Sequence, residues 1–203
     1  TGHTGFKGSW LALWLLHWGA IVEGFSLDPE LVDGSSLFND IDLTKDLFHD
    51  ERSDLRHFDK IVKRVSDFKP DIIFHLAAQP LVRRGYNEPL DTWQINVIGT
   101  CNLLQALRDL KHCCAAVMIT TDKVYDNHEW SYAYRENDKL GGYDPYSSSK
   151  AAAELAIASW RSSYCGSLSH QNNHLKIASA RAGNVIGGGD WAENRIVPDS
   201  IRF

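Results

Sequence analysis

A regular alternation of apolar runs with segments of helical spacing is the feature that most constrains the fold of this chain. The apolar runs, which have the length of buried strands, cover residues 20–27, 71–78, 115–121 and 175–181, with a short strand also expected near 47–49. The segments of helical spacing cover residues 9–18, 56–68, 89–110 and 146–164. Because strands that alternate with helices build βαβ units, the pattern predicts an α/β fold with a parallel sheet and helices on both faces.

The composition allows one domain with a hydrophobic core, since 43% of the 203 residues are hydrophobic and 23% are charged. A formal net charge of −5 argues against nucleic acid or a membrane surface as a partner bound through basic patches. The apolar stretch at residues 10–18 is too short to span a bilayer, and no signal or transit peptide is visible. We therefore expect a cytoplasmic protein with reduced thiols. His112, Cys113 and Cys114 are adjacent, but without further ligand spacing we interpret them as a loop before a strand and expect no metal site.

Ligands of parallel α/β sheets bind beyond the carboxyl ends of the strands, which here predicts a site among the turns at 1–8, 77–88, 120–126 and 182–191. The first turn, TGHTGFKG, has Gly2, Gly5 and Gly8 before a helix, a pattern that can bring backbone N–H groups against a pyrophosphate. That interpretation requires a strand immediately before the turn, so the alternatives are a plain turn or a missing first strand. Asp28, twenty residues after Gly8, is either the acidic residue that meets an adenosine ribose or a turn residue before Pro29.

The stretch YSSSK places Tyr146 and Lys150 four residues apart, so on a helix they share one face. An ammonium near a phenol lowers the pKa of the phenol from about 10 toward the working pH, which makes tyrosine a usable general base for an alcohol proton. The alternative is a pair at helical spacing with no function. A second unusual stretch is TTDKVY, in which Thr121, Asp122 and Lys123 stand at the carboxyl end of an apolar strand.

Six motifs follow one another from the first residue to about residue 184: TGHTGFKG, HLAAQ, NVIGT, TTDKVY, YSSSK and RAGN. Through them the sequence resembles the extended short-chain dehydrogenase/reductase family, and the strings ENDKLGGYDPYSSSK and RAGNVIGGGDWAENRIVPD resemble its sugar-nucleotide 4,6-dehydratases of the CDP-glucose type. The resemblance implies a Rossmann-like, doubly wound, NAD-binding domain over residues 1–203. It also implies a fragment, inactive by itself, that lacks the first strand and most of the C-terminal substrate-binding part. Residues 182–203 would begin the sugar-nucleotide region, and the full-length protein is expected to form a homodimer.

The resemblance also implies which residues bind the cofactor. These are the three glycines of the pyrophosphate turn, an aspartate near the adenine ring, and backbone near the cofactor ribose, which correspond to Gly2, Gly5, Gly8, Asp54, Ala77 and Ala78. Tyr146 and Lys150, which match the catalytic base and its partner, would contact the cofactor as well.

Further roles follow from the same resemblance. Thr121 matches the residue that hydrogen-bonds the reacting sugar oxygen, and Asn96 matches the asparagine that completes a tetrad with Thr121, Tyr146 and Lys150. Asn184 matches a contact to the sugar-nucleotide phosphates.

A 4,6-dehydratase removes hydride from C4 of the sugar, eliminates water across C5 and C6, and returns the hydride to C6. The elimination needs an acid for the C6 hydroxyl and a base for the C5 proton. Asp122 is placed to be the acid if burial keeps it protonated, and Lys123 to be the base if desolvation or a cation such as Lys150 keeps it neutral. The alternative is an Asp–Lys ion pair that merely ends the strand.

Arginines are candidates for contacts to the substrate. Arg83 and Arg84 lie in the 77–88 turn, and because neighbours on an extended chain point apart, we expect only one of them, Arg83, to face a phosphate. Arg195 either meets the nucleotide or is solvated. His75 lies between apolar residues and is interpreted as a core histidine. The tryptophans, with Trp10, Trp14 and Trp18 at helical spacing, are interpreted mostly as core.

The function expected from the sequence is conversion of CDP-glucose to CDP-4-keto-6-deoxyglucose with recycled NAD. A sugar-nucleotide epimerase or reductase of the same fold is an alternative, although Asp122 and Lys123 argue against it, because those reactions need no elimination acid. A non-catalytic dinucleotide-binding sensor is a second alternative, against which Thr121, Tyr146 and Lys150 argue.

Overall fold

The computed structural model describes the chain except residues 33, 169 and 203. Its strands, all paired in parallel, are β1 (Glu23–Ser26), β2 (His49–Arg52), β3 (Ile72–His75), β4 (Cys114–Thr121) and β5 (Leu175–Ala182). β1 pairs with β2, and β4 lies between β3 and β5 in a second sheet. The first residues join the edges of the two sheets, because Gly2 N donates to Phe25 O (2.9 Å) and Leu76 N donates to Thr1 O (3.2 Å).

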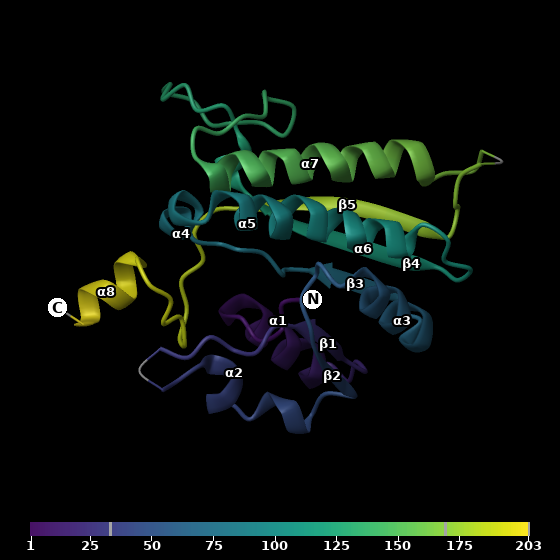
Figure 1. Ribbon diagram of the computed structural model, residues 1–203, viewed down its shortest axis with the longest axis horizontal. Helices are drawn as coiled ribbons and strands as arrows, with labels where there is room; N and C mark the ends of the chain where they lie inside the picture. Colours follow the sequence, from purple (N-terminus) through teal and green to yellow (C-terminus); the bar gives the residue numbers. More distant parts are fainter. Residues whose placement is uncertain (33, 169, 203) are drawn as a thin grey trace.

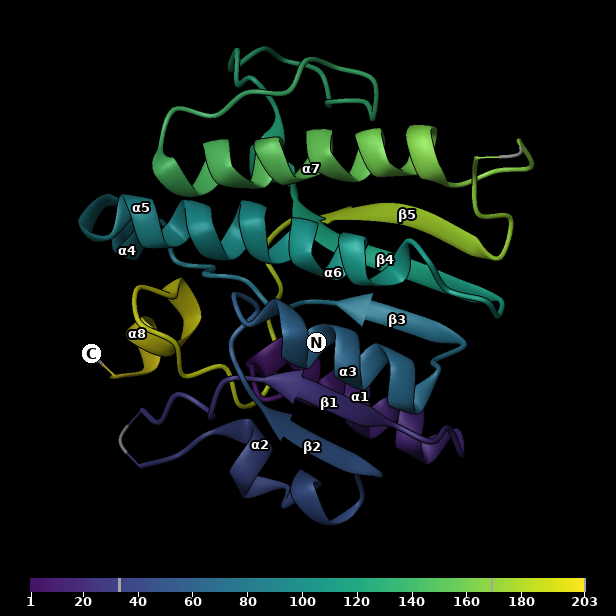
Figure 2. The same cartoon turned by 45° about the vertical axis from the view of Figure 1, so that its right-hand side comes forward.

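Helices cover both faces of the strands, as the sequence predicts (Figures 1 and 2). The helices are α1 (Phe6–His17), α2 (Leu37–Asp40), α3 (Phe58–Phe68), α4 (Val82–Asn87), α5 (Pro89–Trp93), α6 (Thr100–Leu107), α7 (Pro145–Tyr164) and α8 (Ile196–Arg202), with short turns η1 (Leu43–Lys45) and η3 (Asp122–Val124). In Figure 2, α3, α6 and α7 lie in front of the strands and α1 lies behind them. The fold is therefore a Rossmann-like, doubly wound α/β arrangement. No helix in the described part of the chain is long and apolar enough to cross a membrane.

The helix predicted over 89–110 is interrupted in the structure. It begins with Pro89 at the first helical position of α5, continues as a π-helical segment, η2 (Gln94–Gly99), and ends as α6. The turn predicted at 77–88 contains α4, which the sequence did not indicate.

The main hydrophobic core lies between the strands and α3, α6 and α7. Its most deeply buried members include Leu103, Leu104, Leu107, Met118 and Leu175. A smaller cluster, built from Ala12, Phe38 and Leu43, lies under α1 and α2.

The interpretation of the α1 tryptophans as core is wrong. Trp10, Trp14 and Trp18 are 45%, 57% and 66% exposed. The residues that α1 buries are the small Gly8, Ser9 and Ala12, which bring the helix backbone close to its neighbours. At 100° per residue, the tryptophans fall on the opposite side of the helix.

Candidate functional site

Two candidate catalytic residues meet at the carboxyl end of β4. Thr121 is the last residue of that strand, Tyr146 lies in the first turn of α7, and the two buried side chains are hydrogen-bonded to each other. The start of α7 is fixed by Asp144, whose carboxylate accepts from Ser147 N (3.0 Å) and Ser147 Oγ (2.5 Å), and by Pro145 at the first helical position. The N-cap of α7 thus fixes the position of Tyr146 in the first turn of the helix.

The electrostatics of Tyr146 differ from the sequence-based expectation. Burial raises the pKa of its phenol, opposed by the hydrogen bond with Thr121 and the positive charge of Arg195. Lys150 is not what lowers it: its Nζ donates to Ile119 O (3.2 Å), on the backbone of β4. Burial, together with the charge of Lys7, lowers the pKa of Lys150 to about 8. The expected lowering of the tyrosine pKa by Lys150 is therefore wrong in this structure, because desolvation of the phenol dominates.

Asp122 and Lys123 lie directly beside this pair, in η3, and both are exposed. The Thr121 hydroxyl donates to Asp122 Oδ1 (3.1 Å) and accepts from Lys123 N (3.3 Å). A Cβ on Gly183 would lie 3.4 Å from Asp122 Oδ2, so the loop after β5 passes close to this carboxylate. Both side chains are open to water, so burial does not desolvate them as the proposed acid and base roles require. Among the described residues, no ion pair joins Asp122 to Lys123.

The glycine turn has the form of a phosphate cradle. Gly2 has φ +74° and a Cβ there would lie 2.6 Å from Ala77 N, while a Cβ on Gly8 would lie 1.9 Å from Gly2 O. A Cβ on Gly5, by contrast, would meet only Gly2 O, at 3.5 Å, so the turn is open at this residue. Gly5 is the N-cap of α1 and makes no side-chain cap, which leaves N–H groups of the first helical turn for a ligand. The turn fits a dinucleotide pyrophosphate, with Ala77 and the half-buried Ala78 alongside.

The two aspartates predicted to meet the adenosine lie in different surroundings. Asp28 follows β1, and its side chain is 88% exposed, with one oxygen 3.8 Å from Arg52 Nη1. Arg52, which the sequence analysis missed, donates from Nη2 to Asp50 Oδ2 (2.6 Å). Asp54 accepts from Arg56 N (2.8 Å) and from its guanidinium (2.7 and 3.0 Å). Asp28 is therefore open to a ligand, whereas Asp54 is held by Arg56.

Asn96 is fully buried in η2, and its side chain is occupied by the protein itself. Its Oδ1 accepts from Gln79 N (2.9 Å), and its Nδ2 donates to Gln79 O (3.1 Å) and Ser149 Oγ (2.9 Å). This side chain ties the loop after β3 to α7. Sequence reasoning missed Gln79 and Ser149 as partners of Asn96, although the motifs HLAAQ and YSSSK contain them.

The predicted substrate-binding residues are separated by the structure. Arg195 lies near enough to Tyr146 for its charge to lower the pKa of the phenol. Its Nε lies 4.0 Å from Asp190 Oδ2. Arg83 lies on a helix rather than an extended turn, and its Nη1 donates to Asn194 Oδ1 (2.9 Å). Asn184 is exposed in the loop after β5.

A buried ion pair that the sequence analysis missed lies behind Thr121. Arg181 donates from Nε and Nη2 to the two carboxylate oxygens of Glu154 (3.1 and 3.2 Å), and Thr120 Oγ1 donates to Glu154 Oε1 (2.5 Å). The ion pair joins β4, β5 and α7 at the edge that holds the site.

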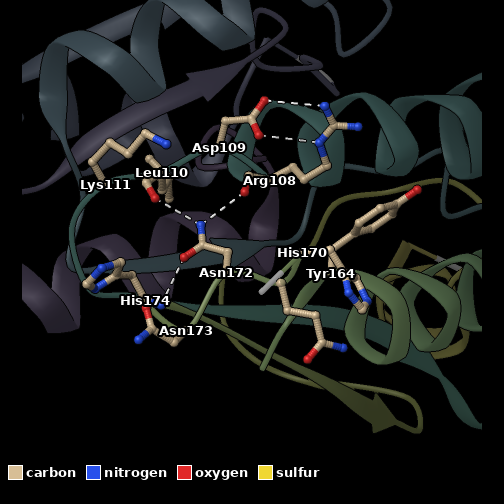
Figure 3. A pocket seen from close by; sticks show the side chains of 10 residues that line it. Arg108, Asp109, Leu110, Lys111, Tyr164, His170, Asn172, Asn173 and His174 are labelled. Carbon is tan, nitrogen blue, oxygen red and sulfur yellow. Dashed lines mark hydrogen bonds and ion pairs between the residues drawn. The ribbon is translucent and has the colours of Figure 1, made fainter. Parts of the chain in front are cut away.

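A polar pocket of about 470 Å³ lies elsewhere, at the amino ends of β4 and β5 (Figure 3). Asn172 lies among the lining residues and donates to Arg108 O (3.0 Å) and Leu110 O (2.9 Å), while Arg108 pairs with Asp109 at 3.5 Å. None of the candidate catalytic or binding residues lines this pocket. Among the described residues there is also no group of three His, Cys, Asp or Glu side chains that could hold a metal ion.

Comparisons with known proteins agree with this arrangement. The family model described as GDP-mannose 4,6 dehydratase matches residues 1–176. CDP-glucose 4,6-dehydratase from Salmonella typhimurium is 50% identical over 202 residues, covering 100% of this chain and 55% of that protein. CDP-paratose 2-epimerase from Salmonella typhi is 32% identical over 176 residues, covering 76% of this chain and 49% of that protein.

Among solved structures, UDP-glucuronic acid 4-epimerase from Bacillus cereus, in complex with UDP-glucuronic acid and NAD, is similar with a TM-score of 0.70 at 25% identity. The similarity covers 89% of this chain and 54% of that one. The chain thus spans about half the length of the proteins it matches. Because the family model covers most of the sequence, the chain belongs to the GDP-mannose 4,6 dehydratase family, within the extended short-chain dehydrogenases/reductases.

Proposed function

We propose that the full-length protein is an NAD-dependent sugar-nucleotide 4,6-dehydratase that converts CDP-glucose to CDP-4-keto-6-deoxyglucose. The observation that carries the proposal is the group at the end of β4, where the hydrogen-bonded Thr121 and Tyr146 adjoin Asp122 and Lys123. The 50% identity over the whole chain to CDP-glucose 4,6-dehydratase from Salmonella typhimurium supports both the reaction and the nucleotide.

The residues of the glycine turn would hold the cofactor pyrophosphate, and Asp28 an adenosine hydroxyl. Bound NAD would supply the acceptor for the C4 hydride and its return to C6. Tyr146 takes the proton of the C4 hydroxyl, with Thr121 hydrogen-bonded to the same oxygen. Asp122 would protonate the C6 hydroxyl as it leaves as water, and Lys123 would remove the C5 proton. A proton would be returned to C5 when the hydride returns to C6. The fit of the turn to a dinucleotide supports the cofactor assignment, as does the NAD complex of the Bacillus cereus epimerase.

The dehydration requires that Asp122 and Lys123 become desolvated, since both are exposed in the structure. We infer that bound substrate excludes water from them, with the loop after β5, which already passes near Asp122, on one side. Arg195 would meet the nucleotide-sugar and Asn184 its phosphates. Arg83 would contribute only if it left Asn194.

A sugar-nucleotide epimerase remains the second candidate, because CDP-paratose 2-epimerase and the Bacillus cereus 4-epimerase match this chain. The test is to incubate the full-length protein with CDP-glucose and no added oxidant. A 4-keto-6-deoxy product develops a base-induced absorbance that an epimer does not. Tyr146→Phe should lower turnover by about 100-fold or more through loss of the general base. An epimer, or unchanged turnover in that variant, would contradict the proposal.

We also propose that the full-length protein is a cytoplasmic homodimer that does not act on nucleic acid. Four free cysteines and a net charge of −5 are consistent with this setting. Light scattering coupled to gel filtration measures the mass directly, and a monomer would rule out the dimer.

A further inference from the structure

A line of buried and partly buried hydrogen bonds runs from the glycine turn to the catalytic helix through His75. This histidine ends β3 and is 3% exposed. Its Nδ1 lies 2.8 Å from Thr1 Oγ1, and its Nε2 lies 3.1 Å from Thr100 Oγ1. Both ring nitrogens are therefore engaged by hydroxyl groups, and their roles as donor or acceptor depend on the tautomer.

The neighbouring bonds determine that tautomer. Thr100 Oγ1 donates its single proton to Asn96 O (2.7 Å), so it can only accept from His75 Nε2. The proton of a neutral ring then lies on Nε2, and Nδ1 accepts from the Thr1 hydroxyl. Thr1 Oγ1 is free to donate because it accepts its other bond from Ala77 N (3.3 Å). All protons in the line point the same way, from Ala77 toward Asn96.

The ring is neutral because of where it lies. Burial holds the pKa of His75 well below its usual range. A neutral ring in one tautomer satisfies all of its polar atoms without a counter-ion, which is the condition for a polar side chain to be stable in a core.

The line continues beyond Asn96 to the residue that carries the base. Asn96 Nδ2 donates to Ser149 Oγ (2.9 Å), and Ser149 Oγ donates to Tyr146 O (2.7 Å). The π-helical segment η2 places Asn96 so that its backbone carbonyl faces Thr100 while its side chain reaches α7. The backbone of Tyr146 is thus connected by hydrogen bonds to the end of β3.

We propose that His75 is a positioning residue, held as the Nε2–H tautomer, that fixes Asn96 through Thr100 and thereby the first turn of α7 on which Tyr146 stands. The catalytic part of this inference rests on the proposed function. The tautomer of His75 and its cause do not depend on that function.

The first experiment needs no activity. The full-length protein is labelled with 15N at histidine, and the His75 ring is assigned by comparison with His75→Gln at neutral pH. The nitrogen shifts should show a protonated Nε2 and an unprotonated Nδ1, and Thr100→Val should move the Nε2 signal. A protonated Nδ1, or a ring unaffected by Thr100→Val, would overturn the inference even if the protein proves to be a dehydratase.

The second experiment separates positioning from mere stability. Ser36→Ala is the control, since Ser36 is buried and its Oγ accepts from Asn39 N (3.2 Å) at the start of α2, outside the line. Thr100→Val should lower the kcat for dehydration by about 10- to 100-fold with little change in KM, as expected when a catalytic group is misplaced. Ser36→Ala should also lower the melting temperature, through loss of a helix cap, but leave kcat nearly unchanged.

His75→Gln keeps an N–H donor near the position of Nε2 and should retain most of the kcat, whereas His75→Leu should not. Equal losses of kcat in Thr100→Val and Ser36→Ala, or in His75→Gln and His75→Leu, would contradict a positioning role. A complete absence of dehydration in the wild-type protein would instead overturn the proposed function, and the nitrogen shifts would still decide the tautomer.

Discussion

The phenol of Tyr146 is subject to opposing influences from its neighbours. Burial raises its pKa, whereas the hydrogen bond with Thr121 and the charge of Arg195 lower it. Lys150, which the sequence pattern suggested as the source of positive charge, is bonded to the backbone of β4 instead. Arg195 therefore offers a way to change the pH dependence of catalysis without altering the base itself.

Replacing Arg195 with leucine should raise the pKa of Tyr146, because a cation that stabilises the phenolate is lost. A base acts only when deprotonated, so the rising limb of kcat/KM against pH should move to higher pH by about 0.5–1 unit. Arg83→Leu is the control, since Arg83 bonds to Asn194 and is not among the main influences on the pKa of Tyr146. The same shift in both variants, or in neither, would argue that Arg195 has no such role.

Oxidation and elimination use different residues in the proposed reaction, so they should be separable. Asp122→Asn removes the acid but leaves Thr121 and Tyr146, and should accumulate reduced cofactor while releasing little dehydrated product. Lys123→Met should do the same and also slow exchange of the C5 proton with solvent deuterium. Stopped-flow absorbance at the reduced nicotinamide band, run beside deuterium incorporation, measures both effects.

Asp126→Asn is a suitable control, because Asp126 lies in the same turn but pairs with Lys139 (2.8 Å). If Lys123→Met exchanges C5 at the normal rate, Lys123 is not the base. In that event its loss should cost only about 0–1 kcal/mol of stability, as for an exposed charge.

At the scale of elements, the carboxyl ends of β4 and β5 and the helix α7 are joined through Glu154. Burial alone would raise the pKa of this carboxyl, but hydrogen bonds from Arg181 and Thr120 outweigh it and hold the pKa below its usual value of 4.5. A carboxylate with a lowered native-state pKa stabilises the fold above pH 4.5, and this contribution is lost as the pH falls through the native value.

Glu154→Gln should therefore destabilise the fold at pH 7 by about 1–3 kcal/mol, since Arg181 loses its charged partner. Below pH 4.5 the gap between wild type and variant should narrow. Urea unfolding at a series of pH values measures this, with the exposed Glu129→Gln as a control for charge alone. A gap that stays constant with pH would show that Glu154 is not ionised in the native state.

The sequence was sufficient to predict most elements but not how they meet. Strands β3, β4 and β5 and the helix α3 were predicted within a few residues, because the strands are apolar runs and the helix has a clear apolar period. The π-helical segment was not, because one extra residue per turn hardly changes the apolar pattern over six residues. Its position depends on tertiary contacts such as the close approach of Gly99 to Leu55, where a Cβ would come within 2.9 Å.

The same limit applies to the site at the scale of the whole molecule. The motifs predicted that Thr121 and Tyr146 would share one edge of the sheet, and the structure brings them into contact. The sequence could not show that Asn96 would be enclosed by Gln79 and Ser149, because its partners lie 17 and 53 residues away. Those contacts arise only when the sheet is assembled.

The adenosine end of the predicted cofactor site indicates whether NAD or NADP is preferred. Asp28 lies within 3.8 Å of Arg52, so a carboxylate that disfavours a 2′-phosphate stands beside a cation that would favour it. Asp28→Asn should improve NADP binding relative to NAD by about fivefold, which corresponds to one charge interaction of about 1 kcal/mol near the surface. Glu30→Gln removes an equal charge that pairs with Arg84 instead, and should leave the ratio unchanged.

Isothermal titration of both cofactors into the full-length protein and each variant measures this ratio. If wild type already binds NADP as tightly as NAD, Asp28 does not meet the ribose.

The central claim is that this site oxidises C4, removes water across C5 and C6, and returns the same hydride to C6. The most direct measurement is NMR of the product formed by the full-length protein from CDP-glucose deuterated at C4, in ordinary water. The proposed reaction predicts CDP-4-keto-6-deoxyglucose with deuterium at C6. Deuterium found in released cofactor or solvent, or retained at C4 of an epimerised sugar, would contradict it.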